Sequence, residues 1–264
     1  MKILSKKNST YILLISLVTY LIAYYVSILA HEWGHGTAAW LLGQKTSPFD
    51  VYYGGWALLH VDENVNYNWL LATHQGSAAA IIGISGISVS IILLLLSFIL
   101  LNCSKIQNNP IIFILFYWFV AINIVPALQY FTFTTFSSEG DVGRFTHGLH
   151  ISPWWIFIPG TILVIIALWR IFKIEAPRAY AVIPIKSLWG QRLFLLATLS
   201  IIFLFIYTHG YNPITDKGTN LPSKVLAIVS IFLVLLLFFV CNPSRDWVKI
   251  KIENYRKFLL QQHK

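Results

Sequence analysis

The chain has 264 residues, of which 57% are hydrophobic and only 11% are charged, and its formal net charge is +9. A soluble domain carries roughly 25% charged residues, so this composition excludes an ordinary soluble fold as well as intrinsic disorder. The two cysteines are too few for a disulfide scaffold, and the basic residues are scattered between apolar runs, which excludes a dedicated nucleic-acid-binding protein. We therefore predict an integral membrane protein.

Six long stretches of the chain lack Asp, Glu, Lys and Arg. A membrane helix needs about 20 predominantly apolar residues, so these stretches predict an all-α polytopic membrane protein with about six transmembrane helices. The expected spans lie near residues 10–42, 77–101, 110–128, 153–172, 190–209 and 223–242. The second stretch is too short for two spans and a turn, so residues 69–75 are expected to form an approach segment.

The distribution of Lys and Arg predicts the orientation. With a cytoplasmic N-terminus, the inner segments hold 15 of these residues and the outer segments hold 4. The positive-inside rule then places both termini in the cytoplasm. The same bias explains the basic charge without any nucleic-acid partner. The lipid bilayer, in a prokaryotic plasma membrane, is the expected surrounding of the protein.

The first predicted span contains His31-Glu32-Trp33-Gly34-His35, which fits the pattern His-Glu-x-x-His. Residues four apart lie on one face of a helix, so the two imidazoles can bind one Zn²⁺. In zinc hydrolases such a Glu takes a proton from the attacking water, which makes Glu32 the candidate catalytic base. The alternative is a helix end at the membrane interface, with the three side chains among lipid headgroups.

A predicted hairpin between the first two spans and a row of small residues in the second span indicate how the site is enclosed. Residues 51–61 form two β-prone runs around Gly54-Gly55, which predict a small β-hairpin near the metal site. Its edge would either bind an extended substrate or simply cover the site. The second span carries small residues that favour close helix packing, namely Gly76, Ala80, Gly83, Gly86 and Ser90.

A catalytic zinc site needs a third protein ligand and an open position for water. The third span is expected to run outward like the first, so the loop after it lies on the same side as the motif. The polar candidates on that side are His60, His74, Glu139, Asp141, His147 and His150. His60 and His74 are isolated, and such histidines are more often hydrogen-bonded structural residues than ligands. His147 and His150 are three residues apart and could serve as ligands instead, or lie in an interfacial loop before Pro153.

With this motif in a span, and with Asn123-Ile124-Val125-Pro126 followed by Gly140-Asp141, the chain resembles the site-2 protease family of intramembrane zinc metalloproteases over about residues 10–150. The resemblance implies a three-helix catalytic core with one zinc per chain. The metal ligands that it implies are His31, His35 and Asp141, with Glu32 as the base.

The second motif has a role of its own in that family. The resemblance implies that Asn123 orients the substrate or a helix, and that Pro126 breaks the helix and turns the chain toward the metal. A hydrogen bond between helices and a simple kink are the alternatives for these two residues. Asp141 lies fifteen residues after Pro126 and follows a glycine, which leaves Glu139 open as the third ligand.

These features divide the chain into three expected parts. Residues 1–150 form the zinc metalloprotease core, 151–244 an accessory three-helix membrane bundle, and 245–264 a basic cytoplasmic tail that lies on the anionic inner leaflet or in solvent. The expected function is a zinc-dependent intramembrane endopeptidase acting on a membrane protein or peptide.

Two other functions stay open at this point. One is a non-catalytic polytopic membrane protein, a transporter or an assembly factor, in which the motif is a relic. The other is an endopeptidase of the prenyl-protein type, which shares the motif but uses a Glu as the third zinc ligand. Separate substitutions of Asp141 and Glu139 distinguish the two proteases.

Overall fold

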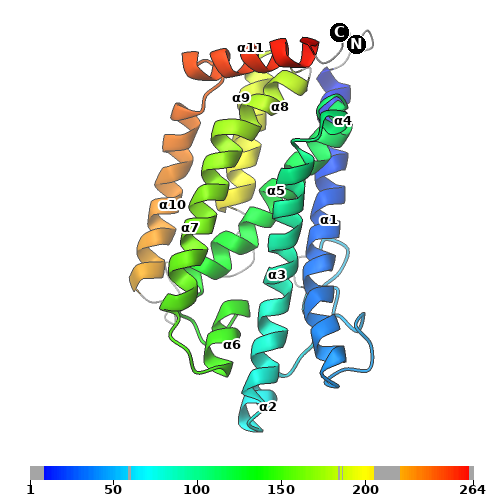
Figure 1. Ribbon diagram of the computed structural model, residues 1–264, viewed down its shortest axis with the longest axis vertical. Coiled ribbons are helices and arrows are strands. Elements are labelled where there is room, and N and C mark those ends of the chain that lie inside the picture. The colour runs from blue at the N-terminus through cyan, green and yellow to red at the C-terminus, as the bar shows by residue number, and fades with distance from the viewer. Residues whose placement is uncertain (1–8, 59–60, 184, 186, 205–220, 262–264) are drawn as a thin grey trace.

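The computed structural model describes residues 9–58, 61–183, 185, 187–204 and 221–261. Within these ranges the chain is all-helical and forms no strand. Most of the long helices run side by side along the long axis of the molecule (Figure 1).

Three helices in the first half of the chain begin within one residue of the predicted spans. They are α1 (Ser9–Leu41), α3 (Gly76–Leu100) and α5 (Pro110–Leu128). Asn109 starts α5, because its side chain accepts hydrogen bonds from the amides of Ile111 and Ile112. All three helices pack against one another, and α5 is the most buried of them. α5 is therefore the central helix of the molecule.

Pro126 does not break α5, so this expectation is wrong. The helix continues through Pro126 to Leu128 and then widens into the π-helical turn η2 (Gln129–Phe133). An interior proline removes one backbone hydrogen bond and crowds the carbonyl four residues earlier, and helices in a membrane tolerate this through local adjustments such as a π-helical turn. The chain leaves the helix only after η2 and passes through residues 134–140 into α6 (Asp141–Gly148).

Four helices are long and apolar enough to cross a membrane, which is fewer than the six expected. They are Leu14–Leu41, Gly76–Leu100, Pro110–Phe133 and Trp154–Val182. The last of these joins α7 (Trp154–Arg170), η3 (Ile171–Glu175) and α8 (Ala176–Val182).

The fifth and sixth predicted spans coincide with shorter apolar helices. These are α9 (Leu188–Leu199) with η4 (Ser200–Leu204), and α10 (Leu221–Val240), whose apolar part begins at Lys224. Residues 205–209, the rest of the fifth predicted span, lie outside the described residues. The structure therefore supports four of the six spans.

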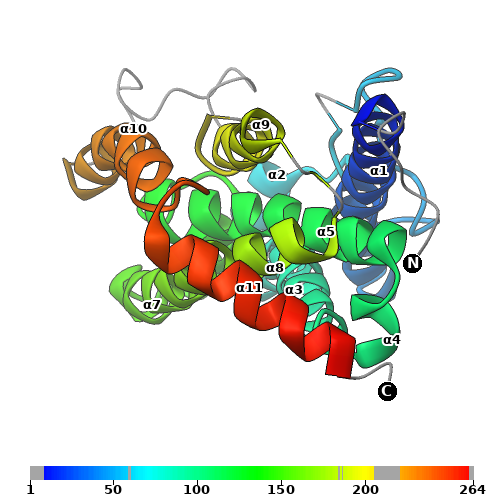
Figure 2. The same cartoon turned by 90° about the horizontal axis from the view of Figure 1, so that it is seen from above.

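The two ends of the molecule carry different short helices. α2 (Tyr67–Ala72), which covers the first part of the predicted approach segment 69–75, lies with α6 at one end of the molecule (Figure 1). At the other end lie α4 (Ser104–Gln107), α8 and α11 (Asp246–Gln261). Seen from above, α11 crosses over the ends of the other helices (Figure 2).

The expected β-hairpin at 51–61 does not form in the described part of that segment. A single isolated antiparallel bridge joins Tyr52 and Asp62, whose backbones exchange two hydrogen bonds of 2.9 Å. Between them, Gly54, Gly55 and Leu58 have positive φ, and an extended strand cannot continue through such residues. The described part of the segment is an irregular loop.

Candidate metal centre

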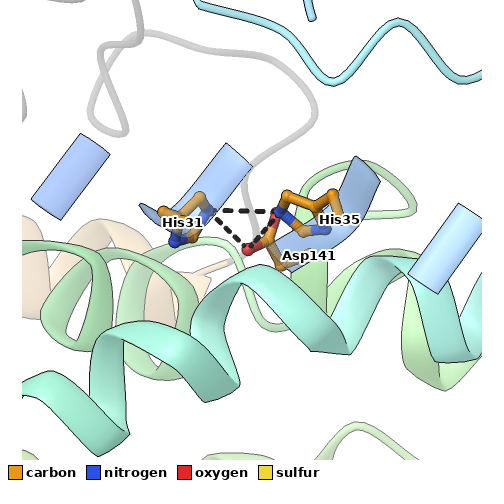
Figure 3. A group of neighbouring side chains, drawn as sticks. All are labelled: His31, His35 and Asp141. Atoms are coloured by element: carbon orange, nitrogen blue, oxygen red, sulfur yellow. Dashed lines mark hydrogen bonds and ion pairs between the residues drawn. The ribbon is translucent and has the colours of Figure 1, made fainter. Parts of the chain in front are cut away.

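Three side chains from two distant segments of the chain meet at one point (Figure 3). His31 and His35 lie on one face of α1, and Asp141 is the first residue of α6. The Oδ2 atom of Asp141 lies 3.1 Å from Nε2 of His31 and 3.3 Å from Nε2 of His35. The two nitrogens are 3.2 Å apart. All three residues are buried, and together they have the donor set of a metal site.

The size of this triangle fits a small metal ion. Tetrahedral ligands that lie about 2.05 Å from Zn²⁺ are separated from one another by about 3.3 Å. The three distances between the ligand atoms are 3.1, 3.2 and 3.3 Å. Three ligand atoms at these separations could share one small metal ion.

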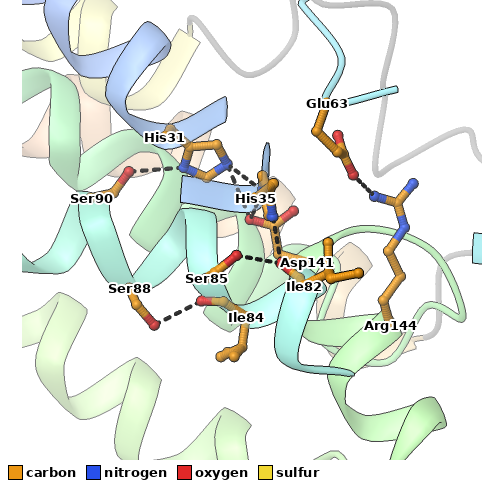
Figure 4. Close-up of polar contacts among 10 residues, drawn as sticks. All are labelled: His31, His35, Glu63, Ile82, Ile84, Ser85, Ser88, Ser90, Asp141 and Arg144. Carbon is orange, nitrogen blue, oxygen red and sulfur yellow. Dashed lines mark hydrogen bonds and ion pairs between the residues drawn. The ribbon is translucent and has the colours of Figure 1, made fainter. Parts of the chain in front are cut away.

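Hydrogen bonds on the far side of each ring determine which nitrogen faces the cluster (Figure 4). Nδ1 of His35 donates to the carbonyl oxygen of Ile82 at 2.7 Å, which leaves Nε2 of the neutral ring without a proton. Nδ1 of His31 lies 2.9 Å from Oγ of Ser90. Such partners are the usual support of metal-binding histidines. The lone pairs of the cluster therefore converge on a position that a cation would stabilise.

The small residues of α3 allow the close approach of α1 and α6. A Cβ atom on Gly86 would lie 2.1 Å from Nε2 of His35, and one on Gly83 would lie 3.0 Å from the carbonyl oxygen of Asp141. The predicted ladder of small residues is therefore a packing surface that supports the cluster from behind.

Gly140 directs the chain into α6 so that Asp141 is the first helical residue. Its φ of +80° lies in the left-handed region, which favours glycine. At this position the helix dipole stabilises a negative side chain. Burial acts to raise the pKa of Asp141, but the positive charge that His35 and His31 carry when protonated outweighs it and holds that pKa well below its ordinary value. Positive charge at the cluster, from protonated rings or from a bound cation, therefore keeps Asp141 ionised.

The other candidates for the third ligand lie away from the cluster. Glu139, the nearest rival in sequence, is exposed. His74, His147 and His150 are exposed as well, and His60 lies outside the described residues. Asp141 is the candidate that the fold brings to the two histidines.

Glu32 borders a cavity of about 230 Å³ beside the cluster. Its Oε2 atom is buried and has no hydrogen-bond partner among the described residues. The ring of Tyr130 forms part of the cavity wall and stacks on His31, with 5.9 Å between ring centres. A carboxylate oxygen in this position is available to accept a proton from a molecule in the cavity.

Asn123 and Pro126 from α5 line the same cavity. Nδ2 of Asn123 donates to Oγ of Ser27 on α1 and to the carbonyl of Phe119, both at 2.8 Å. Asn123 thus joins α5 to the helix that carries both histidines. Its Oδ1 atom is buried and unpaired within the described part of the chain.

Sequence reasoning missed a buried ion pair near the cluster. Nη1 of Arg144 in α6 lies 2.7 Å from Oε1 of Glu63, in the loop before α2 (Figure 4). The guanidinium also lies 3.7 Å above the ring of Tyr67. Burial acts to raise the pKa of Glu63, but His35 and Arg144 outweigh it and hold that pKa below its ordinary value. No spacing pattern links these residues, so only the fold reveals them.

The Glu63→Ala substitution is expected to lower the free energy of unfolding by about 2–3 kcal/mol, because it leaves a partly buried guanidinium without its partner. This expected loss of stability is smaller than that for a fully buried pair, because the Arg144 side chain is 25% exposed. A lowered pKa also means that the pair contributes fully above about pH 4.3. Its contribution is lost as the pH falls through the folded-state pKa. Thermal unfolding of the detergent-solubilised protein at several pH values measures both effects.

The matched control is Asp50→Ala in the same loop. The Asp50 side chain is 54% exposed and lies 3.9 Å from Nζ of Lys45, so its loss is expected to change the unfolding free energy by less than about 1 kcal/mol. Equal destabilisation by both variants would contradict a special role for Glu63.

Comparisons of the chain with protein-family models, curated protein sequences and solved structures gave no match. The candidate metal centre therefore rests on the geometry of its own residues.

Proposed function

We propose that the protein is a zinc-dependent intramembrane endopeptidase that hydrolyses a peptide bond in or near the membrane. The observation that carries the proposal is the convergence of two imidazole nitrogens and an ionised carboxylate beside Glu32, at a cavity among apolar helices. His31, His35 and Asp141 would hold the zinc. Zinc bound there would acidify a water molecule and polarise the scissile carbonyl.

The residues of the chain itself supply proton transfer and positioning. The unpaired oxygen of Glu32 accepts a proton from the attacking water, and Glu32 then returns it to the departing amine. The unpaired Oδ1 of Asn123 at the cavity is an acceptor for an N–H group of the bound peptide. The ring of Tyr130 covers His31 and limits the access of bulk water to this side of the cluster.

The position of the site favours a membrane-embedded substrate. The motif lies inside Leu14–Leu41, one of the four candidate spans. A peptide must therefore come to the level of the helices to meet Glu32, as a membrane protein or a membrane-bound peptide would. The Lys and Arg bias favours both termini on the cytoplasmic side of a multi-pass membrane protein. We propose a prokaryotic plasma membrane as its location.

Metal analysis of the detergent-purified protein tests this proposal. We expect one zinc per chain in the wild type and almost none in His35→Ala or Asp141→Ala, because each variant removes one of three protein ligands. Glu139→Ala, which removes an exposed carboxylate two residues from Asp141, is expected to keep its zinc.

The other outcomes have distinct meanings. A wild-type protein that holds no zinc even after incubation with the metal would overturn the protease and leave a membrane protein with a relic motif. Zinc lost from Glu139→Ala but kept by Asp141→Ala would move the third ligand to Glu139 and favour an endopeptidase of the prenyl-protein type.

A further inference from the structure

A second cleft lies at the end of the molecule opposite to the metal cluster. It has a volume of about 370 Å³ and lies where α11 crosses α8 (Figure 2). Three cationic side chains line it, Lys173, Arg178 and Lys251, and no carboxylate belongs to its described lining. The cleft therefore has a positive surface.

The positive charge in this cleft is not neutralised by the surrounding described residues. Nη1 of Arg178 is held 2.8 Å from Oδ1 of Asn102 and 3.4 Å from Oε2 of Glu175. Glu175 is shared with Arg170, so it balances only part of this charge. Lys173 and Lys251 are exposed and form no ion pair with a described carboxylate. Nζ of Lys173 lies 4.1 Å from the centre of the Trp247 ring, a contact that leaves its charge without a described counter-ion. The cleft thus has two lysines whose charge no described carboxylate balances.

A neutral donor in the same cleft also lacks a partner. The hydroxyl of Tyr255 is buried and makes no hydrogen bond within the described part of the chain, and Tyr255 lines the cleft. Burial raises the pKa of Tyr255 to about 12, so the hydroxyl keeps its proton. An unsatisfied donor beside three cations is suited to an oxygen-rich anion such as a phosphate.

An apolar stripe lies along α7, the helix that continues into the segment carrying Lys173. Its residues are three and four positions apart and so share one face of the helix. They are Ile158, Ile162, Ile165 and Trp169, with exposed fractions of 54%, 54%, 59% and 58%. Lys173 follows Trp169 by one further turn. A ligand with both a phosphate and long apolar chains would cover the cleft and the stripe together.

The location of the cleft also favours a lipid. It lies at the same end as α4, α8 and α11 (Figure 1), whose basic residues belong to the segments that the charge bias assigns to the cytoplasm. The cytoplasmic leaflet is rich in anionic lipids, and basic pockets between helices at that level bind their headgroups.

We propose that the cleft between α8 and α11 binds the phosphate headgroup of an anionic phospholipid, with its acyl chains along the exposed stripe of α7. Lys173 and Lys251 supply the charge, Arg178 is a pre-oriented cation, and Tyr255 donates a hydrogen bond. This site is separate from the metal cluster and does not depend on its function.

Native mass spectrometry of the full chain in detergent tests this site, with phosphatidylglycerol, phosphatidylcholine and inorganic phosphate as separate probes. We expect phosphatidylglycerol to stay bound and phosphatidylcholine to be lost. Each basic residue near a membrane contributes about 1 kcal/mol of attraction, so Lys173→Gln with Lys251→Gln is expected to weaken phosphatidylglycerol binding roughly 30-fold. The matched control, Lys249→Gln with Lys257→Gln, removes two exposed charges of α11 outside the cleft and is expected to change binding less than about threefold.

Several results would overturn the proposal. Equal weakening by both double variants would mean diffuse attraction without a site, and equal retention of phosphatidylcholine would exclude recognition of charge. Competition by inorganic phosphate at the same concentration as the lipid would make a free anion the ligand. Thermal unfolding without lipid verifies that the variants are folded.

A milder variant keeps the test valid if the lysine double variant does not fold. Tyr255→Phe removes only a hydroxyl and is expected to weaken phosphatidylglycerol binding about tenfold, the contribution of a hydrogen bond to a charged group. Unchanged binding by Tyr255→Phe would overturn the proposed contact. Asp141→Ala is expected to bind the lipid as the wild type does.

Discussion

The Gly86→Ala variant is expected to bind its metal about 10–100-fold more weakly than the wild type. A Cβ atom on Gly86 would lie 2.1 Å from Nε2 of His35, the ring atom that faces the cluster. His35 cannot simply swing aside, because its Nδ1 is bonded to the carbonyl of Ile82 on the same helix α3. Zinc per chain, measured in competition with a chelator, gives the result.

Ser88→Ala is the matched control for this variant. Ser88 lies on the exposed face of α3, and its Oγ bonds only to the carbonyl of Ile84 in its own helix (Figure 4). Alanine is a better helix former than glycine by about 1 kcal/mol, so helix propensity alone would make Gly86→Ala more stable and leave its metal in place. A Gly86→Ala protein with a full complement of zinc would show that α3 does not fix the position of His35.

The Glu32→Gln variant is expected to lose peptide cleavage by a factor of about 10²–10⁴, the usual contribution of a general base. Its zinc content is expected to stay at the wild-type level, because Glu32 is not part of the ligand triangle. Its stability is expected to be unchanged or higher, since the substitution replaces a buried, unpaired carboxylate oxygen with a neutral amide. Mass spectrometry of transmembrane peptides incubated with the protein in liposomes detects the products.

Two comparisons make this result specific. Glu139→Gln changes an exposed carboxylate of the loop before α6 and is expected to cleave as the wild type does. If Glu32→Gln lost its zinc together with its activity, Glu32 would be a structural part of the metal centre. Full activity of Glu32→Gln would remove its assignment as the base.

The chain itself predicts the parts of the fold that depend on local pattern. The stretches without charged residues predicted the first residues of α1, α3 and α5 to within one position. This works because a membrane helix forms its own backbone hydrogen bonds and places few charged side chains in lipid. The spacing of His31 and His35 predicted that both rings lie on one face, which the structure confirms. The small residues of α3 predicted close packing between helices, because small side chains let two helix backbones approach each other.

The features that depend on distant segments escaped this reasoning. The π-helical turn η2 after Pro126 sets where α6 begins, and no local signal gives its length. The apolar residues of 51–61 resembled a hairpin, but positive φ at Gly54, Gly55 and Leu58 makes a wide loop. Glu63 and Arg144 pair only because this loop and α6 meet beside the cluster.

The division of the metal centre between α1 and α6 has a consequence for biosynthesis. Asp141 follows His35 by about a hundred residues, and translation adds about 5–20 residues per second. The nascent chain therefore carries two histidines without their carboxylate for roughly 5–20 s, until Asp141 is added. In the proposed protease the ligand set would be complete only after the first, second and third of its long helices have been made, so a half-made chain would lack the metal centre that peptide cleavage needs.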